Sequence, residues 1–331
     1  MKTRLVAIAK DEGAYLADWV FHHRNFGFDE VHVCLNRTTD GSVEVLERLK
    51  ERDPAVSFEH VDWIDYCPAG LRKHMQTIAY AKALGEARRD GIDWLMFLDV
   101  DEFWVPADFV TPIHAYLDIL FSDQPAGAVC HLWHNEHGRE SAFAPIAVGP
   151  YFSVAPNVKS LFPVTSVHSV GVHVPRMNKD FPIYDADGVP MTFYENTHRA
   201  ARNTLGVKSA FVLHRMYRSE TEYLATTLRG NPERDDYGLK RNRKGYLAAQ
   251  SNRGGRLWPS EAHDAYLQAR DRFIQEAGLW PLLEQEQNRV RQRAAIAERR
   301  LREMLDQTED QAARELASRI VSGLSMFDQN D

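Results

Sequence analysis

The chain has 331 residues, 44% of them hydrophobic and 26% charged, which is the composition of a globular protein long enough to bury a large core. A formal net charge of -7 argues against broad nucleic-acid binding, so we expect no nucleic-acid partner. The three cysteines, Cys34, Cys67 and Cys130, are widely spaced, which favours free thiols over a disulfide or zinc framework and fits a reducing compartment. No stretch approaches the ~18 apolar residues of a membrane span, so we expect a cytoplasmic protein.

Short apolar runs alternate with amphipathic segments through the N-terminal third of the chain. Runs at 5–9 and 31–35 predict buried strands, the alternating stretch 56–63 predicts a third strand, and the segments that follow them carry apolar residues at helical spacing. Strand and helix in alternation are typical of parallel βαβ units. We therefore expect an α/β fold with a mostly parallel sheet flanked by helices.

An unbroken apolar run from Trp94 to Leu98 leads directly into the carboxylates Asp99, Asp101 and Glu102. Such a run predicts a strand buried on both faces, and because isolated buried charges are costly, the carboxylates mark where the strand leaves the core. In an open α/β sheet, ligands bind beyond the carboxyl ends of the strands, where we expect Asp99 and Asp101. Two residues apart in an extended chain, their side chains should point the same way.

Carboxylates at this spacing suit Mg²⁺ or Mn²⁺, ions that keep coordination sites for water and substrate phosphates. The alternative is that they cap a turn and are only solvated. The chain has neither the Gly-x-Gly-x-x-Gly fingerprint nor a Gly-x-x-x-x-Gly-Lys-Ser/Thr loop, so phosphate has to be held by a metal ion or by basic side chains. A second apolar strand, 210–213, ends on His214, which is a second candidate ligand position.

Several motifs occur in a fixed order over residues 3–230. They are Lys10-Asp11-Glu12, Asn36 with Thr39-Asp40-Gly41-Ser42, Gln76, Phe97-Leu98-Asp99-Val100-Asp101-Glu102-Phe103, Lys159-Ser160-Leu161-Phe162-Pro163, His173-Val174-Pro175 and His214-Arg215-Met216-Tyr217-Arg218-Ser219. In this order the chain resembles bacterial family 2 glycosyltransferases, above all the subgroup with an Asp-Val-Asp-Glu-Phe motif, and it is similar to the family 92 enzymes. The resemblance implies a GT-A fold whose Asp-x-Asp motif holds the metal on a nucleotide-diphospho-sugar.

The resemblance also implies roles for individual residues. Asp101 would be the principal metal ligand, Asp99 would contact the ribose or the metal, and His214 would complete the metal site. An imidazole ligand shifts the preference from Mg²⁺ towards Mn²⁺. Glu12 and Asn36 would face the nucleoside, although family 2 enzymes commonly carry an aspartate where this chain has Asn36.

Three further donor-site residues follow from the same resemblance. Arg72 and Gln76 would line the donor cleft, and Lys159 would contact the diphosphate. The alternative for Lys159 is a solvated surface lysine, because lysine side chains are usually exposed.

A general base is needed if the transfer inverts the anomeric configuration, and it would be an Asp or Glu near the acceptor hydroxyl. Glu136, which follows a strand expected to neighbour the acidic one, is the first candidate, and Asp185 is the second. The nearby His131, His134 and His137 raise the alternative of a zinc site. Strand alternation would scatter these three rings over two faces, which argues against it.

The C-terminal part of the chain is predicted to be organised separately. We expect a catalytic domain at 1–230, a charged, glycine-containing linker or loop at 231–259, and a helical extension at 260–331. The amphipathic C-terminal helices could form a homodimer, contact the inner face of a membrane, or pack on the domain with a solvated outer face. Their irregular heptads leave all three alternatives open.

The expected function is metal-dependent transfer of a sugar from a nucleotide-diphospho-sugar to a saccharide or glycan acceptor, with cell-surface polysaccharide synthesis as its setting. One alternative is a phosphatase of the haloacid dehalogenase type, in which the first Asp forms an aspartyl phosphate and for which the Asp235-Asp236 pair is the only further feature. The other alternative is a protein that binds nucleotide sugars without turnover.

Overall fold

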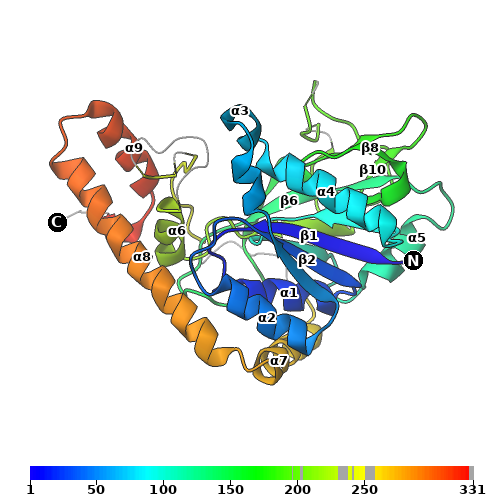
Figure 1. The fold of residues 1–331 in the computed structure, drawn as a ribbon, viewed down its shortest axis with the longest axis horizontal. Helices are drawn as coiled ribbons and strands as arrows, with labels where there is room; N and C mark the ends of the chain where they lie inside the picture. The colour runs from blue at the N-terminus through cyan, green and yellow to red at the C-terminus, as the bar shows by residue number, and fades with distance from the viewer. Residues whose placement is uncertain (196, 202–203, 230–237, 241, 250–257, 328–331) are drawn as a thin grey trace.

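The computed structural model describes residues 1–195, 197–201, 204–229, 238–240, 242–249 and 258–327. Within them, a large sheet has helices on both faces, and a group of C-terminal helices packs at one side (Figure 1). The strand order is β3-β2-β1-β4-β7-β6-β11-β5, and β10 pairs with β6 outside this path. The Asp235-Asp236 pair and most of the predicted linker, 231–259, lie outside the described residues.

The N-terminal half of the sheet contains four parallel strands. They are β1 (Thr3–Ala9), β2 (Glu30–Leu35), β3 (Val56–His60) and β4 (Trp94–Phe97). Helices α1 (Leu16–Asn25) and α2 (Ser42–Arg52) lie on one face and α4 (Met75–Arg89) lies on the other (Figure 1). The predicted βαβ units are therefore confirmed. The strand predicted at 56–63 ends early, because Asp62–Tyr66 forms a 3-10 turn before the short helix α3 (Ala69–Arg72).

The C-terminal half of the sheet mixes strand directions. It comprises β5 (Glu102–Pro106), β6 (Ala128–Glu136), β7 (Phe152–Pro163), β10 (Ile183–Asp185) and β11 (Ala210–His214). β7 is antiparallel to both β4 and β6, while β11 is parallel to β6 and antiparallel to β5. The predicted α/β fold class, a mostly parallel sheet flanked by helices, is confirmed. However, β7 separates β6 from β4, so the expected pairing of those two strands is wrong.

Smaller elements complete this part of the chain. They are α5 (Ile113–Leu120), the hairpin of β8 (Val167–Ser169) and β9 (Arg176–Met177), and α6 (Glu220–Thr227). The helix α6 begins with a capping box in which Ser219 and Glu222 satisfy each other's backbone amides. This cap fixes the start of α6 a few residues after the end of β11.

Each face of the sheet buries its own apolar core. Leu5 and Leu16 belong to the core on the α1 face, and Val6 and Tyr80 belong to the core on the α4 face. The Tyr80 ring stacks on Phe97 with centroids 4.0 Å apart, a contact worth roughly 0.5–1.5 kcal/mol beyond area burial. This stack holds the first turns of α4 over the end of β4, where the acidic residues follow.

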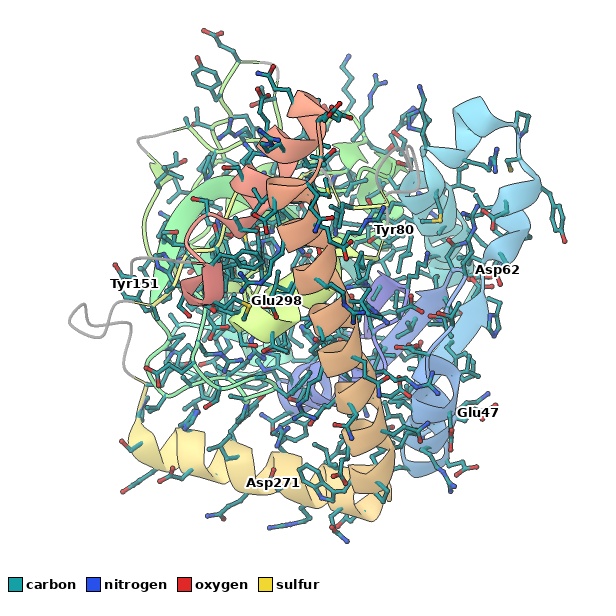
Figure 2. The ribbon with its side chains drawn as sticks, turned by 90° about the vertical axis from the view of Figure 1, so that its left-hand side faces the viewer. Glu47, Asp62, Tyr80, Tyr151, Asp271 and Glu298 are labelled. Atoms are coloured by element: carbon teal, nitrogen blue, oxygen red, sulfur yellow. The ribbon has the colours of Figure 1, made fainter. Side chains whose placement is uncertain are left out.

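The predicted helical extension is formed by α7 (Ser260–Glu276), α8 (Trp280–Asp306) and α9 (Gln311–Val321). Figure 2 shows α8 running along one side of the molecule, between α7 and α9. Buried Val290 and Leu301 of α8 share a core with Tyr223 of α6 and Ile320 of α9. Their apolar faces are thus covered within the chain. Among the described helices, none combines the length and the apolar character needed to cross a membrane.

Candidate active site

The acidic residues after β4 lie in a turn rather than in an extended segment. The Glu102 amide donates to the Asp99 carbonyl over 2.9 Å, and β5 begins at Glu102. The expectation that the two aspartates point the same way is therefore wrong, because the chain reverses between them. Asp99 accepts a hydrogen bond from Gln76 Nε2 over 3.3 Å, whereas Asp101 faces His214.

The pairing of β11 with β5 brings Asp101 and His214 together. His214, the last residue of β11, is in register with Glu102, and its Nε2 lies 3.7 Å from Asp101 Oδ2. The other ring nitrogen, Nδ1, lies 3.2 Å from the side-chain oxygen of Asn135, a contact that orients the ring. Metal-binding histidines are typically oriented by such a hydrogen bond. The two side chains therefore fit a divalent cation.

Asp99 does not complete a compact three-ligand group with them. Among the described residues, the one group of three whose ligand atoms all lie within 4.8 Å of one another is elsewhere, on β2 and β3. The side chains of Asp99 and Asp101 are 35% and 27% exposed, so both remain accessible to a ligand. The geometry thus provides two protein ligands for a cation, with Asp99 to one side.

The electrostatic environment keeps Asp101 ionised. Burial works in the opposite direction, but His214, Arg218 and Arg243 together hold the pKa of Asp101 well below its usual value. The carboxylate is therefore charged throughout the physiological pH range and available to a cation.

Four basic side chains gathered near Asp101 and Glu12 form what we call the cationic cluster: Arg218, Arg229, Lys240 and Arg243. They come from the turn before α6, the end of α6 and the segment after it. Burial, with nearby Arg243 and Arg229, lowers the pKa of Lys240 to about 8. Cations gathered beside a half-buried carboxylate make a site suited to a polyanion, because electrostatic interactions strengthen where water is partly excluded.

Glu12 is the counter-charge of this cluster. Its carboxylate lies 2.6 Å from Arg229 Nη2 and 3.7 Å from Arg218 Nη1, and it is buried at the end of β1. The Arg218 guanidinium also lies over the Tyr15 ring at 3.5 Å, a cation–π contact. Sequence reasoning missed the cluster, because only Arg218 lies in a recognised motif and the other three residues are dispersed between 229 and 243.

The other predicted nucleoside and donor residues lie around the same edge of the sheet. Asn36 follows β2 and its side-chain amide donates to Asp62 over 3.4 Å. Gln76 lies in the first turn of α4 and contacts Asp99, while Arg72 is exposed at the end of α3.

Lys159 is fully buried, so the alternative of a solvated surface lysine is wrong. Its ammonium lies 3.0 Å from Glu102 and 3.4 Å from Asp99. Glu102 in turn accepts from the Asp99 amide over 2.8 Å. Burial raises the pKa of Glu102 to about 7, against the lowering effect of Lys159. This network supports the acidic turn from inside the core.

The two predicted base candidates are each held in an ion pair with a basic side chain. Glu136 is buried at the end of β6, and it accepts a 2.9 Å hydrogen bond from Arg215 Nε. Its neighbour Asn135 contacts His214, so strand alternation directs Glu136 to the other face of the sheet. Asp185 lies beside Lys208, at 3.0 Å, at the start of β11 rather than at its His214 end. Neither carboxylate joins the acidic turn.

The three histidines of the zinc alternative have separate surroundings. His131 packs near Trp104 and Tyr116, His134 contacts Phe152 and Phe211, and His137 packs on Tyr151. They do not form a three-ligand group in the described part of the chain. The expected scattering of the rings agrees with this arrangement.

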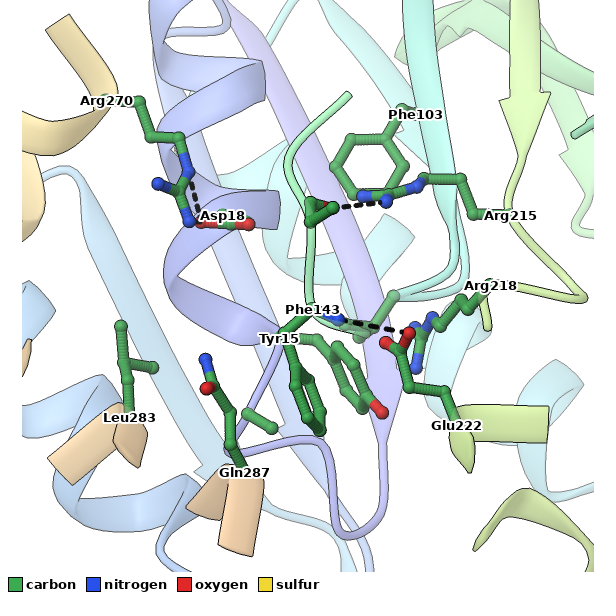
Figure 3. A pocket seen from close by; sticks show the side chains of 13 residues that line it. Tyr15, Asp18, Phe103, Phe143, Arg215, Arg218, Glu222, Arg270, Leu283 and Gln287 are labelled. Carbon is green, nitrogen blue, oxygen red and sulfur yellow. Dashed lines mark hydrogen bonds and ion pairs between the residues drawn. The ribbon is translucent and has the colours of Figure 1, made fainter. Parts of the chain in front are cut away.

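A small cavity of about 20 Å³ lies behind the acidic turn, between α1 and the C-terminal helices (Figure 3). Tyr15, Phe103 and Arg218 line it, and Arg270 donates to Asp18 at its edge. A cavity of this volume holds about one water molecule. The cavity is therefore too small for a nucleotide sugar.

A ligand site at the carboxyl ends of parallel strands is the usual arrangement of α/β proteins with open sheets. The sequence model of glycosyltransferase family 92 matches residues 8–180, which is more than half of the chain. The chain therefore belongs to glycosyltransferase family 92. The matched segment contains Asp99 and Asp101 but ends before His214 and the cationic cluster.

Comparison with solved structures gives partial overlaps. The apo form of the bifunctional glycosyltransferase WbbM matches with a TM-score of 0.27 and 18% identity, covering 40% of this chain and 23% of that chain. A 4-diphosphocytidyl-2C-methyl-D-erythritol synthase matches with a TM-score of 0.30 and 12% identity. The match covers 58% of this chain and 94% of the synthase chain. A mannose-1-phosphate geranyltransferase from Thermus thermophilus matches with a TM-score of 0.29 and 10% identity. The match covers 50% of this chain and 58% of the transferase chain. No curated protein matches the chain.

Proposed function

We propose that this chain transfers a sugar from a nucleotide-diphospho-sugar to a saccharide or glycan acceptor, with Mn²⁺ or Mg²⁺ held by Asp101 and His214. Membership of a glycosyltransferase family supports sugar transfer. The observation that carries the rest of the proposal is the position of Asp101 and His214, 3.7 Å apart and beside the cationic cluster. Side chains that can hold a metal ion, placed next to basic side chains, suit a diphosphate that is bound to that metal ion.

The residues of the site divide the work of binding the donor. A divalent cation, when bound, neutralises the charge that develops on a leaving diphosphate. Arg218 and Arg243 add fixed positive charge in a buried setting. Asp99, oriented by Gln76 and 35% exposed, is left to accept hydrogen bonds from the ribose. Glu136 and Asp185 are not proposed as the general base, because each is already held in an ion pair with a basic side chain.

Turnover of nucleotide sugars tests this proposal. The protein is incubated with Mn²⁺ and a panel of nucleotide sugars, and released nucleoside diphosphate is measured. We expect release that depends on the sugar nucleotide and is lost in Asp101→Asn but kept in Asp123→Asn, which changes an exposed aspartate remote from the site.

Three outcomes contradict the proposal. Release of inorganic phosphate from phosphate esters supports the phosphatase, and tight binding of nucleotide sugars without turnover supports the binding protein. Full activity in Asp101→Asn removes Asp101 from the mechanism.

A further inference from the structure

A second group of potential metal ligands lies on the sheet face covered by α4. His32 and Cys34 are two residues apart on β2, so they share a face, and Glu59 of β3 is in register with Cys34. This is the face that α4 covers, because Cys34 belongs to the same core as Tyr80. The group lies on β2 and β3, whereas His214 ends β11 and Asp101 lies in the turn between β4 and β5.

The three ligand atoms are close enough to share one small cation. His32 Nε2 lies 3.6 Å from Glu59 Oε1, Cys34 Sγ lies 3.9 Å from the same oxygen, and all three lie within 4.8 Å of one another. Tetrahedral Zn²⁺, with bonds of ~2.0–2.3 Å, spaces its ligand atoms ~3.3–3.8 Å apart. Small side-chain movements would therefore close the site.

His32 is oriented as a metal ligand. Its Nδ1 lies 2.9 Å from the Ser57 hydroxyl, while its Nε2 is buried and has no hydrogen-bond partner. An imidazole fixed through one nitrogen, with the other aimed at a carboxylate and a thiol, is the arrangement found at metal sites.

A cation already lies beside this group in the form of Lys82. Its ammonium is 2.7 Å and 2.8 Å from the two Glu59 oxygens and 2.5 Å from Glu86, one turn further along α4. Glu86 can hold the ammonium if Glu59 turns to another cation. The Lys82 ammonium therefore competes with a metal ion for Glu59. It can leave Glu59 without a large rearrangement, because Glu86 still holds it.

We propose that His32, Cys34 and Glu59 form a zinc site in which Zn²⁺ takes the place of the Lys82 ammonium beside Glu59. A thiolate in the ligand set selects Zn²⁺ over the Mn²⁺ or Mg²⁺ proposed for Asp101 and His214. Three protein ligands leave the fourth position to water. On binding, the Cys34 thiol loses its proton to solvent, and the metal cross-links β2 to β3.

This site could not be predicted from the sequence, because the spacing of the cysteines matches no zinc motif. The ligands come together only through the register of two parallel strands, in which His32 faces Ser57 and Cys34 faces Glu59.

Cobalt substitution tests the proposal on the full chain after removal of metals with a chelator. Co²⁺ bound to a thiolate gives a near-ultraviolet charge-transfer band, which Zn²⁺ should abolish on displacing it. We expect this band in the wild type and in the control Cys130→Ser, another buried cysteine, but not in Cys34→Ser.

Calorimetry with Zn²⁺ then separates the ligands from the competitor. Lys82→Met should tighten Zn²⁺ binding, while Ser57→Ala should weaken it ~10-fold by freeing His32. A wild-type Co²⁺ complex without a thiolate band, an unchanged band in Cys34→Ser, or the same Zn²⁺ affinity in Lys82→Met would each overturn the proposal. Asp101→Asn should leave the zinc site intact, so failure here is distinguishable from failure of the proposed transferase site.

Discussion

Replacing the buried Lys159 tests how the acidic turn is supported. Lys159 and Glu102 both have fully buried side chains 3.0 Å apart, and Lys159 also lies 3.4 Å from Asp99. Lys159→Met keeps the apolar stem but leaves Glu102 without its counter-charge. Removing one partner of a buried ion pair costs about 3–5 kcal/mol, so we expect a loss of this size in the free energy of unfolding at pH 8.

The raised pKa of Glu102 predicts how this loss depends on pH. Burial raises the pKa of Glu102 from 4.5 to about 7, so Glu102 is largely ionised at pH 8 and increasingly protonated below pH 7. A protonated Glu102 needs no counter-charge, and the cost of Lys159→Met should therefore shrink at pH 6. The double variant Lys159→Met/Glu102→Gln should recover about 1–3 kcal/mol at pH 8, because the uncompensated charge is gone.

Urea unfolding, followed by tryptophan fluorescence at pH 6 and pH 8, measures these free energies. Lys179→Met, which changes an exposed lysine, is the matched control and should be nearly neutral. A loss below about 1 kcal/mol in Lys159→Met at pH 8, or no recovery in the double variant, would refute the view that this ion pair supports the acidic turn.

Further predictions concern the charges around the site. Arg243→Gln should raise the KM for the donor about tenfold with little effect on unfolding, as measured by initial rates and by urea titration. Because the pKa of Lys240 is lowered to about 8, donor binding should weaken as pH rises through 8, and calorimetry should show that Lys240→Arg removes this change. The effect of Lys240 on stability has the opposite sign, since its folded-state pKa lies below 10.5 and folding is favoured as pH rises through 8. Glu102, whose pKa is raised, contributes stability below pH 4.5 that is lost as pH rises through about 7, and Glu102→Gln should abolish this slope in urea titrations. Glu136→Gln should lower the free energy of unfolding by leaving Arg215 unpaired, while sugar transfer by the folded protein persists.

The sequence was most informative where local chemistry alone decides the structure. The apolar run ending at Asp99 predicted a buried strand with acidic residues at its carboxyl end, and β4 has only buried residues. The strand ending on His214 was predicted for the same reason, and the structure places His214 beside Asp101. These features depend on burial and charge within a few residues, which a single sequence displays.

Features that depend on strand order and on long-range contacts were not predictable. Nothing local indicates that β7 inserts between β4 and β6, yet this insertion buries Lys159 next to Glu102. The turn that separates the directions of Asp99 and Asp101 is stabilised by the same long-range ion pair. The cationic cluster likewise forms only when α6 and the segment after it fold back towards β1 and β4.

Binding of nucleoside diphosphates tests the central claim most directly, because it isolates the metal and the diphosphate from the acceptor and from turnover. Calorimetric titrations of UDP and other nucleoside diphosphates are compared with and without Mn²⁺, in the wild type, in Asp101→Asn and in the control Asp123→Asn. The account predicts that binding of at least one nucleoside diphosphate is strengthened by Mn²⁺ in the wild type and in the control, and that Asp101→Asn loses this strengthening. Equal binding with and without Mn²⁺, or an unchanged response in Asp101→Asn, would contradict it.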